Sequence, residues 1–397
     1  MDISLPNNDY FELDGYKDTL WTCQMCTCGF CLFECQAYKL TGLETAGARG
    51  RNQLALGILN GELNLEDVPD LMMYVCTTCR YCEEVCALNL PLAVKGRNLR
   101  VSGATTSELL RSMKVEAGKV PVEVRDVLNN FEIYGNPYGL PHKIKDDWVK
   151  GLGSEPMDLN NKEVIFYVGA FVPYEDRATI VAEAIFNVLR KAGLAIGMLG
   201  SKELSSGGLV RPMGEEGLFE VFVNHCSKII KENNIKRIIC LSPHDYDAFH
   251  NYYEELGIKV EHYTETIANL IKEKKLRIDR DFNKKVTYQD PCYLGRRNKI
   301  YEPPREILNS IPGLELIEMN KVKTEAHCCG GGGVGLWMDF PEARMDLQRV
   351  DEANETGAEV LATACPICLQ MLDNGIKARD YKIEVKDIGL ILQDCII

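Results

Sequence analysis

The stretch HCCGGGG at residues 327–333 places two adjacent cysteines directly before a run of glycines. Three further cysteines frame this pair, one before it and two after it, at spacings of 36, 36 and 3 residues. Two arms of equal length around an adjacent pair indicate one composite metal site, because thiolates are ligands that soft metals prefer. The five cysteines are Cys292, Cys328, Cys329, Cys365 and Cys368.

The preceding part of the chain repeats this frame without the thiols. Subtracting 123 from each cysteine number leads to small or hard-oxygen residues, and Pro366 falls on Pro243. The five equivalent positions are Gly169, Ser205, Ser206, Ser242 and Asp245. We therefore predict a duplicated unit that has kept its ligands in one copy, and a structural role for the other copy.

Strand and helix patterns alternate in both units. EVIFYVGAF (163–171) and KRIICLSP (236–243) are typical of buried strands, and ATIVAEAIFNVLRKAGL (178–194) is typical of an amphipathic helix. Such alternation predicts α/β units with parallel sheets, in which sites form at the carboxyl ends of strands. Cys292 and Cys365 follow predicted strands, so we expect them at such an edge.

A different cysteine pattern occurs near the N-terminus. Residues 71–90 read LMMYVCTTCRYCEEVCALNL, with cysteines at the x2, x2, x3 spacing of bacterial ferredoxins. In that pattern the fourth cysteine binds the other cluster of a pair. The cysteines of this run are Cys76, Cys79, Cys82 and Cys86.

A second run, TCQMCTCGFCLFEC at 22–35, fits the same pattern except that Met25 stands where the first ligand is expected. Cys23 or Cys26 must supply it, and we favour Cys23 because an x4 then x2 spacing is a known iron–sulfur arrangement. Two [4Fe–4S] clusters with crossed ligation are predicted, and zinc is the alternative. One cluster would take Cys23, Cys28, Cys31 and Cys86, and the other Cys35, Cys76, Cys79 and Cys82.

Composition limits the class of protein. The chain has 397 residues, and its net charge of −13 argues against a nucleic-acid partner. Most of the seventeen cysteines cluster at metal-ligand spacings, and together with the lack of a signal peptide this indicates reduced thiols in the cytoplasm. No apolar run reaches the ~18 residues that span a bilayer, so we expect membrane contact only through a partner. The expected division is a helical ferredoxin block (1–136), a linker (137–160) and two α/β units (161–275 and 282–397).

The helical ferredoxin block, GNPYGLP at 135–141, HCCGGGG and CPIC at 365–368 resemble the D-type subunit of heterodisulfide reductases. The same organisation occurs in iron–sulfur subunits of glycolate, lactate and anaerobic glycerol-3-phosphate dehydrogenases and of class II benzoyl-CoA reductase complexes. The resemblance implies an oxidoreductase subunit with cysteine-rich (CCG) units, a flavoprotein partner and a third, non-cubane cluster on the five cysteines.

Spacing alone leaves the five-cysteine site open, because it also permits four ligands with one spare thiol, or zinc. His327 is expected to donate a hydrogen bond or a proton near this site. Tyr293 stands where relatives often carry histidine, in a C-H-L-G-R string, and this weakens the case for disulfide reduction. We expect electrons to pass through two cubanes to the five-cysteine site, with thiol–disulfide chemistry there like that of heterodisulfide reductases. The alternatives are a non-catalytic relay subunit of a flavoprotein dehydrogenase or benzoyl-CoA reductase complex, and a zinc-stabilised scaffold.

Overall fold

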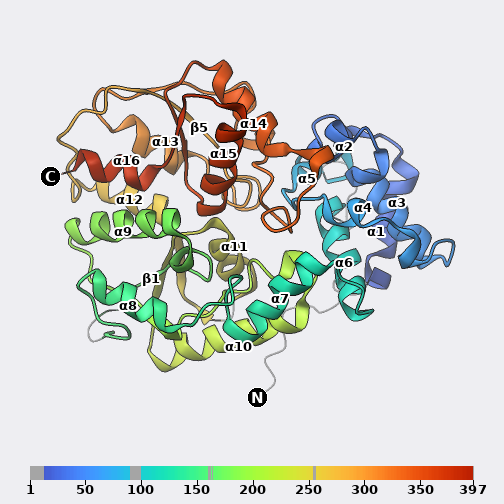
Figure 1. Cartoon of the computed structure of the whole chain (residues 1–397), viewed down its shortest axis with the longest axis horizontal. Coiled ribbons are helices and arrows are strands. Elements are labelled where there is room, and N and C mark those ends of the chain that lie inside the picture. The colour runs from blue at the N-terminus through green and yellow to red at the C-terminus, as the bar shows by residue number, and fades with distance from the viewer. Residues whose placement is uncertain (1–12, 90–99, 160–161, 163, 254–255, 397) are drawn as a thin grey trace.

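The computed structural model describes residues 13–89, 100–159, 162, 164–253 and 256–396. Helices and 3₁₀ turns form the described part of residues 13–134, and two α/β units follow. In Figure 1 the helical block lies beside the two units, which are stacked on one another. The predicted fold class, a helical ferredoxin-type block followed by two α/β units with parallel sheets, is confirmed.

The helical block is held together by its first, third and sixth helices. Leu20 of the first helix, Leu56 of the third and Leu110 of the sixth share a small buried core. The sixth helix begins at a capping serine, since the side chain of Ser102 accepts a hydrogen bond from the N–H of Thr105. The helices are α1 Lys17–Cys26, α2 Gln36–Thr41, α3 Ala48–Leu59, α4 Asp70–Tyr74, α5 Tyr81–Glu84, α6 Gly103–Glu116 and α7 Val122–Tyr134.

Each α/β unit contains a parallel sheet of four strands. The strand orders are β2-β1-β3-β4 and β6-β5-β7-β8, so the second sheet repeats the topology of the first. The shared strand order of the two sheets supports the duplication predicted from the spacing of the cysteines. The strands are β1 Val164–Tyr167, β2 Ile196–Gly197, β3 Arg237–Cys240, β4 Lys259–His262, β5 Lys285–Tyr288, β6 Glu315–Leu316, β7 Val360–Thr363 and β8 Glu384–Asp387.

Helices of the two units pack against each other in a reciprocal way. The last helix of the chain lies on α9 (Asp176–Lys191) of the first unit, where Gly389 packs directly against Ile185. Tyr263 of the first unit donates a 2.7 Å hydrogen bond to Asp387 of the second. The helices are α8 Lys143–Gly151, α9 Asp176–Lys191, α10 Glu216–Glu232, α11 Pro243–Tyr252, α12 Tyr263–Lys272, α13 Glu302–Asn309, α14 Met345–Glu355, α15 Pro366–Arg379 and α16 Ile388–Cys395. None of the helices described is long and apolar enough to span a membrane.

The segment expected to be a linker differs from that expectation. It contains α8, whose Lys145 and Val149 are buried against the first unit. Lys145 donates hydrogen bonds to the carbonyl oxygens of Gly169 and Glu203, at 2.9 and 2.7 Å. The prolines and glycines that suggested a linker therefore lie next to a helix that is part of the first unit's core.

Candidate metal centres

Cysteines of the helical block line two cavities. The first is hereafter the outer cavity because Cys28, one of its thiols, is exposed. Burial raises the pKa of Cys86, and the nearby thiols of Cys23 and Cys28 raise it further, so the two sequence runs meet here. The cysteines lining the outer cavity are Cys23, Cys26, Cys28, Cys31, Cys82 and Cys86.

Cys23 and Cys26 differ in their surroundings. The side-chain N–H of the buried Asn52 donates a hydrogen bond to the sulfur of Cys23, at 3.2 Å. Asn52 is itself oriented by Thr106, whose hydroxyl donates to its amide oxygen at 2.7 Å. Burial raises the pKa of the Cys26 thiol, and the hydrogen bonds that also act on this pKa involve the neighbouring Cys28. A sulfur held by a buried and fixed side-chain amide is better placed to act as a ligand than that of Cys26.

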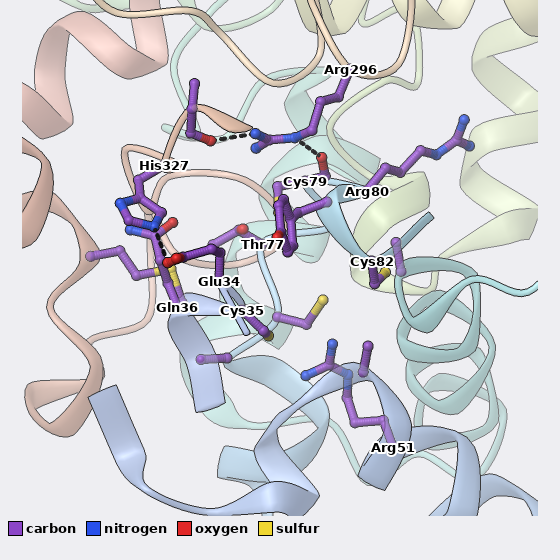
Figure 2. Close-up of a pocket in the computed structure, with 17 residues that line it drawn as sticks. Glu34, Cys35, Gln36, Arg51, Thr77, Cys79, Arg80, Cys82, Arg296 and His327 are labelled. Atoms are coloured by element: carbon purple, nitrogen blue, oxygen red, sulfur yellow. Dashed lines mark hydrogen bonds and ion pairs between the residues drawn. The ribbon is translucent and has the colours of Figure 1, made fainter. Parts of the chain in front are cut away.

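The second cavity is hereafter the inner cavity (Figure 2). It is lined by Cys35, Cys76, Cys79 and Cys82, so Cys82 borders both cavities. Figure 2 shows the side chain of Arg51 reaching toward these thiols. Burial lowers the pKa of Arg51, but the surrounding thiols, Cys76 foremost, raise it by more. A buried cation thus balances the negative charge of this group.

Each of the two cysteine runs has left-handed backbone conformations on both sides of one cysteine. Thr27 and Gly29 flank Cys28 with φ values of 51° and 69°, and the residues flanking Cys79, Thr78 and Arg80, have 51° and 58°. Left-handed conformations turn successive N–H groups into a concavity that favours anions. Consistent with this, the N–H of Thr78 points at the sulfur of Cys76, at 3.4 Å.

The five C-terminal cysteines come together where the second sheet ends. Cys292 follows β5, Cys365 caps α15 after β7, and Cys368 lies in the first turn of that helix. Cys328 and Cys329 arrive on the glycine-rich loop, and the sulfurs of Cys292 and Cys328 are 3.9 Å apart. All five residues are between 1 and 7% exposed.

Two of these thiols favour the ionised form that binds metals. Burial raises the pKa of Cys365, but hydrogen bonds from Cys368 and His244 outweigh it and the pKa is lowered to about 5. Contacts with Cys292 and Cys329 lower the pKa of Cys328 well below its usual value. The N–H of Gly330 also donates to the sulfur of Cys328, at 3.4 Å, as expected for a glycine-rich loop that serves a metal site.

The inner cavity and the C-terminal group are joined through their backbones. A Cβ atom on Gly332 would overlap the carbonyl oxygen of Thr77, and one on Gly333 would stand 2.7 Å from that of Cys76. Arg296, four residues after Cys292, donates to the carbonyl oxygen of Cys79 at 2.7 Å. The glycine run therefore allows the C-terminal loop to press against the loop that carries the inner thiols.

His327 and Tyr293 both lie at this junction. His327 lines the inner cavity, with one ring nitrogen against Glu352 and the other 3.2 Å from Glu34. The hydroxyl of Tyr293 is 2.8 Å from that of Thr78. His327 is thus tied to two carboxylates, and its expected role as a donor stays a prediction.

In the first unit the matching space is filled by side chains. Ser206 donates a 2.5 Å hydrogen bond to Asp245, and the N–H of Gly169 donates to Glu203 at 2.9 Å. Lys145 lies 3.5 Å from the same carboxylate of Glu203. A buried ionic network therefore stands where the second unit has thiols.

Several residues of these centres were missed by sequence reasoning. Asn52, Arg51 and Gln36 are single polar residues on helical patterns, with no signal that they face thiols. His244 had a weak signal, because the Ser-Pro-His-Asp stretch it belongs to is the counterpart of Cys-Pro-Ile-Cys at 365–368.

The donor sets suit iron–sulfur clusters. Within the described ranges, no three His, Cys, Asp or Glu side chains converge closely enough to hold a single metal ion. The block thiols instead surround two cavities, four or more to each, with the buried cation Arg51 beside the inner group, which fits polynuclear clusters with thiolate ligands.

Comparison with protein families gives two matches. Residues 22–90 match the 4Fe-4S dicluster domain, and residues 286–373 match the cysteine-rich domain called CCG. The first covers both ferredoxin-like runs and the second covers all five C-terminal cysteines. The chain therefore combines an iron–sulfur domain near its N-terminus with a cysteine-rich domain in its last third.

Two curated relatives that match most of this chain are named as oxidoreductases. The chain is 32% identical over 361 residues to a probable iron–sulfur-binding oxidoreductase, FadF, of Bacillus subtilis, and 31% identical over 370 residues to the EtfAB:quinone oxidoreductase of Syntrophomonas wolfei. These matches cover 87 and 88% of this chain but 49% of each relative, so the chain spans about half their length.

The D-type subunit of the dihydromethanophenazine:CoB–CoM heterodisulfide reductase of Methanosarcina acetivorans is 31% identical over 339 residues, which are 80% of this chain and 76% of that relative. Similarity of this extent, together with both domain matches, covers the helical block and the cysteine-rich unit. The chain belongs to the family of iron–sulfur oxidoreductases that includes the D-type subunit of heterodisulfide reductases.

Proposed function

We propose that the chain is an electron-transfer subunit in which two [4Fe–4S] clusters relay electrons to a third, non-cubane cluster on the five C-terminal cysteines. The observation that carries the proposal is that the outer, inner and C-terminal groups of thiols adjoin one another. The outer and inner cavities share Cys82, and the glycine run beside Cys329 packs on Thr77 of the inner loop.

Each centre has its own ligands in this proposal. Clusters of this kind supply one-electron redox steps when bound. The protein balances their charge, with Arg51 buried at the inner group and Arg111 donating to the carbonyl oxygen of Cys76. The outer ligands are Cys23, Cys28, Cys31 and Cys86; the inner ligands are Cys35, Cys76, Cys79 and Cys82; the C-terminal ligands are Cys292, Cys328, Cys329, Cys365 and Cys368.

Relay is favoured over substrate chemistry at the C-terminal centre. Its cysteines are at most 7% exposed, so a disulfide substrate would have to displace covering residues to reach them. Thiol–disulfide chemistry is the second candidate, because the five-cysteine set is complete and a relative belongs to a heterodisulfide reductase. Assaying the loaded chain with reduced viologen and disulfides separates the two: turnover would support the second candidate, and its absence in a fully loaded chain would support the relay.

We further propose that the chain works within a larger complex in the cytoplasm, with a flavoprotein partner. The relative from Syntrophomonas wolfei is named for EtfAB and quinone, so a protein of this family exchanges electrons with separate components. Cysteines in reduced, metallated form suit a reducing compartment. Co-purification from the native host would test for the partner, and an active free monomer would count against it.

Metal analysis and low-temperature EPR of the anaerobically purified chain test the proposal. Three four-iron clusters require about twelve irons per chain, and the two cubanes alone about eight. Zinc in place of iron would support the scaffold alternative. Eight irons with empty C-terminal thiols would remove the third cluster from the proposal while leaving the two-cubane relay.

A further inference from the structure

His244 belongs to the first α/β unit but faces the thiols of the second. It is the second residue of α11, which begins at Pro243 as α15 begins at Pro366. Its side chain is 5% exposed, and its ring stacks on that of Tyr293, with centroids 3.8 Å apart and planes inclined by 26°. Because Tyr293 directly follows Cys292, the imidazole of His244 lies at the edge of the C-terminal group of thiols.

Contacts from all three parts of the chain hold this stack in place. The hydroxyl of Tyr293 meets Thr78 of the inner loop, at 2.8 Å. The guanidinium carbon of Arg297 lies 4.2 Å from the ring centroid of Tyr293, and Arg297 pairs with Asp247 of α11 at 3.1 Å. The orientation of His244 is therefore set by packing and is not free to change.

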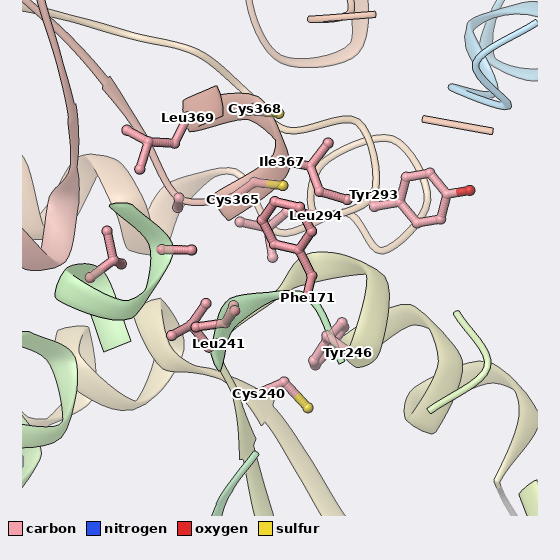
Figure 3. Packing of buried hydrophobic residues seen from close by; sticks show 14 of the residues in the cluster. Phe171, Cys240, Leu241, Tyr246, Tyr293, Leu294, Cys365, Ile367, Cys368 and Leu369 are labelled. Atoms are coloured by element: carbon pink, nitrogen blue, oxygen red, sulfur yellow. The ribbon is translucent and has the colours of Figure 1, made fainter. Parts of the chain in front are cut away.

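The thiol that His244 influences most directly is Cys365, because interaction with His244 is among the causes that lower the pKa of Cys365. Figure 3 shows Cys365 and Tyr293 where the two units meet, on the side of Leu241 and Tyr246 of the first unit. The Nδ1 atom of His244 is buried and meets no partner at normal hydrogen-bond distance in the part of the chain described. The imidazole is thus not satisfied by its own unit.

We propose that His244 is a positioning residue of the C-terminal centre, through which the unit that lacks thiols donates a hydrogen bond to the sulfur of Cys365. The inference rests on the proposed function, since it concerns the cluster held there. Donors to sulfur stabilise the more negative, reduced state of a cluster and so raise its reduction potential. The first unit would then contribute to the chemistry of the second without binding a metal itself.

Replacing His244 tests this in the full chain, loaded with iron and sulfide under anaerobic conditions. In an EPR-monitored redox titration, His244→Leu should make the C-terminal centre about tenfold harder to reduce, which is ~59 mV for one electron. His244→Gln keeps a donor and should restore part of the shift. His250→Gln, an exposed position on the same helix, should leave the potential unchanged. The signals of the other two clusters should not move in any variant.

A second measurement avoids the risk that His244→Leu fails to load. Pulsed EPR of the wild-type chain labelled with ¹⁵N-histidine should show a nitrogen coupled to the C-terminal centre. The coupling should persist in His327→Gln and vanish in His244→Gln. An unchanged potential in His244→Leu, or no nitrogen coupling in the wild type, would overturn the inference. A wild-type chain with no third centre would instead overturn the proposed function.

Discussion

The side chain of Gln36 forms two hydrogen bonds with the backbone N–H and C=O of Cys328. The N–H of Cys328 donates to the side-chain oxygen of Gln36 at 2.6 Å, and the Gln36 amide donates to the Cys328 carbonyl oxygen at 3.2 Å. Because Gln36 directly follows Cys35, the inner thiols and the C-terminal thiols are fixed to one another through a single buried side chain.

Replacing Gln36 by leucine should destabilise this junction. The variant would leave the N–H and C=O of Cys328 buried without partners, and we expect a loss of about 1–3 kcal/mol of unfolding free energy. Denaturant unfolding of the loaded chain measures it. Gln36→Glu keeps the acceptor and loses the donor, so it should fall between leucine and wild type; a leucine variant as stable as wild type would contradict the role given to Gln36.

The glycine run should be intolerant of a single methyl group. Gly332→Ala would overlap the Thr77 carbonyl oxygen, and the backbone of Gly332 is not in the left-handed region, so the effect arises from contact alone. Overpacking of this kind costs about 1–3 kcal/mol and would separate the inner and C-terminal loops. We expect lower stability and slower reduction of the C-terminal centre in rapid freeze-quench EPR.

Gly151→Ala is the matched control for this substitution. Gly151 ends α8 and a Cβ atom there would meet no atom within 4 Å. Stability and electron-transfer rate should stay at wild-type values. If Gly332→Ala behaves like Gly151→Ala, the close approach of the two loops does not matter for the relay.

Serine substitutions should decide between Cys23 and Cys26. Cys23→Ser should lose the outer cluster, about four irons per chain, because the sulfur fixed by Asn52 is the better-placed ligand. Cys26→Ser should retain those irons and the EPR signal. Iron analysis of both variants checks this, and loss of iron only in Cys26→Ser would reverse the assignment.

Sequence patterns anticipated the parts of the molecule that depend on local signals. The buried stretch before Cys365 formed β7 as predicted, and the structure adds that Pro243 and Pro366, which share one frame, both begin helices. Gln36 could not be found in this way and His244 had only a weak signal, because their contacts form only when three parts of the chain meet. A lone glutamine on a helix and a lone histidine after a proline carry no periodic signal.

The free energy of unfolding should fall as the pH rises from about 5 to 7, because the buried Glu203 loses its proton in the folded state. Burial raises the pKa of Glu203 from 4.5 to about 7, so in this range the folded state binds more protons than the unfolded state. The contribution of Glu203 to the free energy of unfolding is therefore fully present below pH 4.5 and is lost as the pH passes 7, a change of roughly 3 kcal/mol. Denaturant unfolding of the chain across this range should show the slope.

Glu203→Gln should remove the part of the pH dependence of unfolding free energy that is due to Glu203, since an amide does not titrate. Glu220→Gln, an exposed position on α10, should leave the slope as in wild type. An identical pH dependence in wild type and Glu203→Gln would show that the buried network of the first unit does not take up a proton.

Restoring thiols to the first unit should not restore a metal site. The change is to place cysteine at the five positions that match the second unit, Gly169, Ser205, Ser206, Ser242 and Asp245. The backbone has diverged, because Gly169 has a φ of 82° whereas Cys292 is not among the residues of positive φ. Lys145 also remains bonded to the carbonyl oxygens of Gly169 and Glu203, so its cation and the carboxylate beside it still fill the space. Iron analysis should give the wild-type value, with circular dichroism to show that the variant is folded. About four additional irons per chain would mean that loss of the thiols alone emptied the first unit.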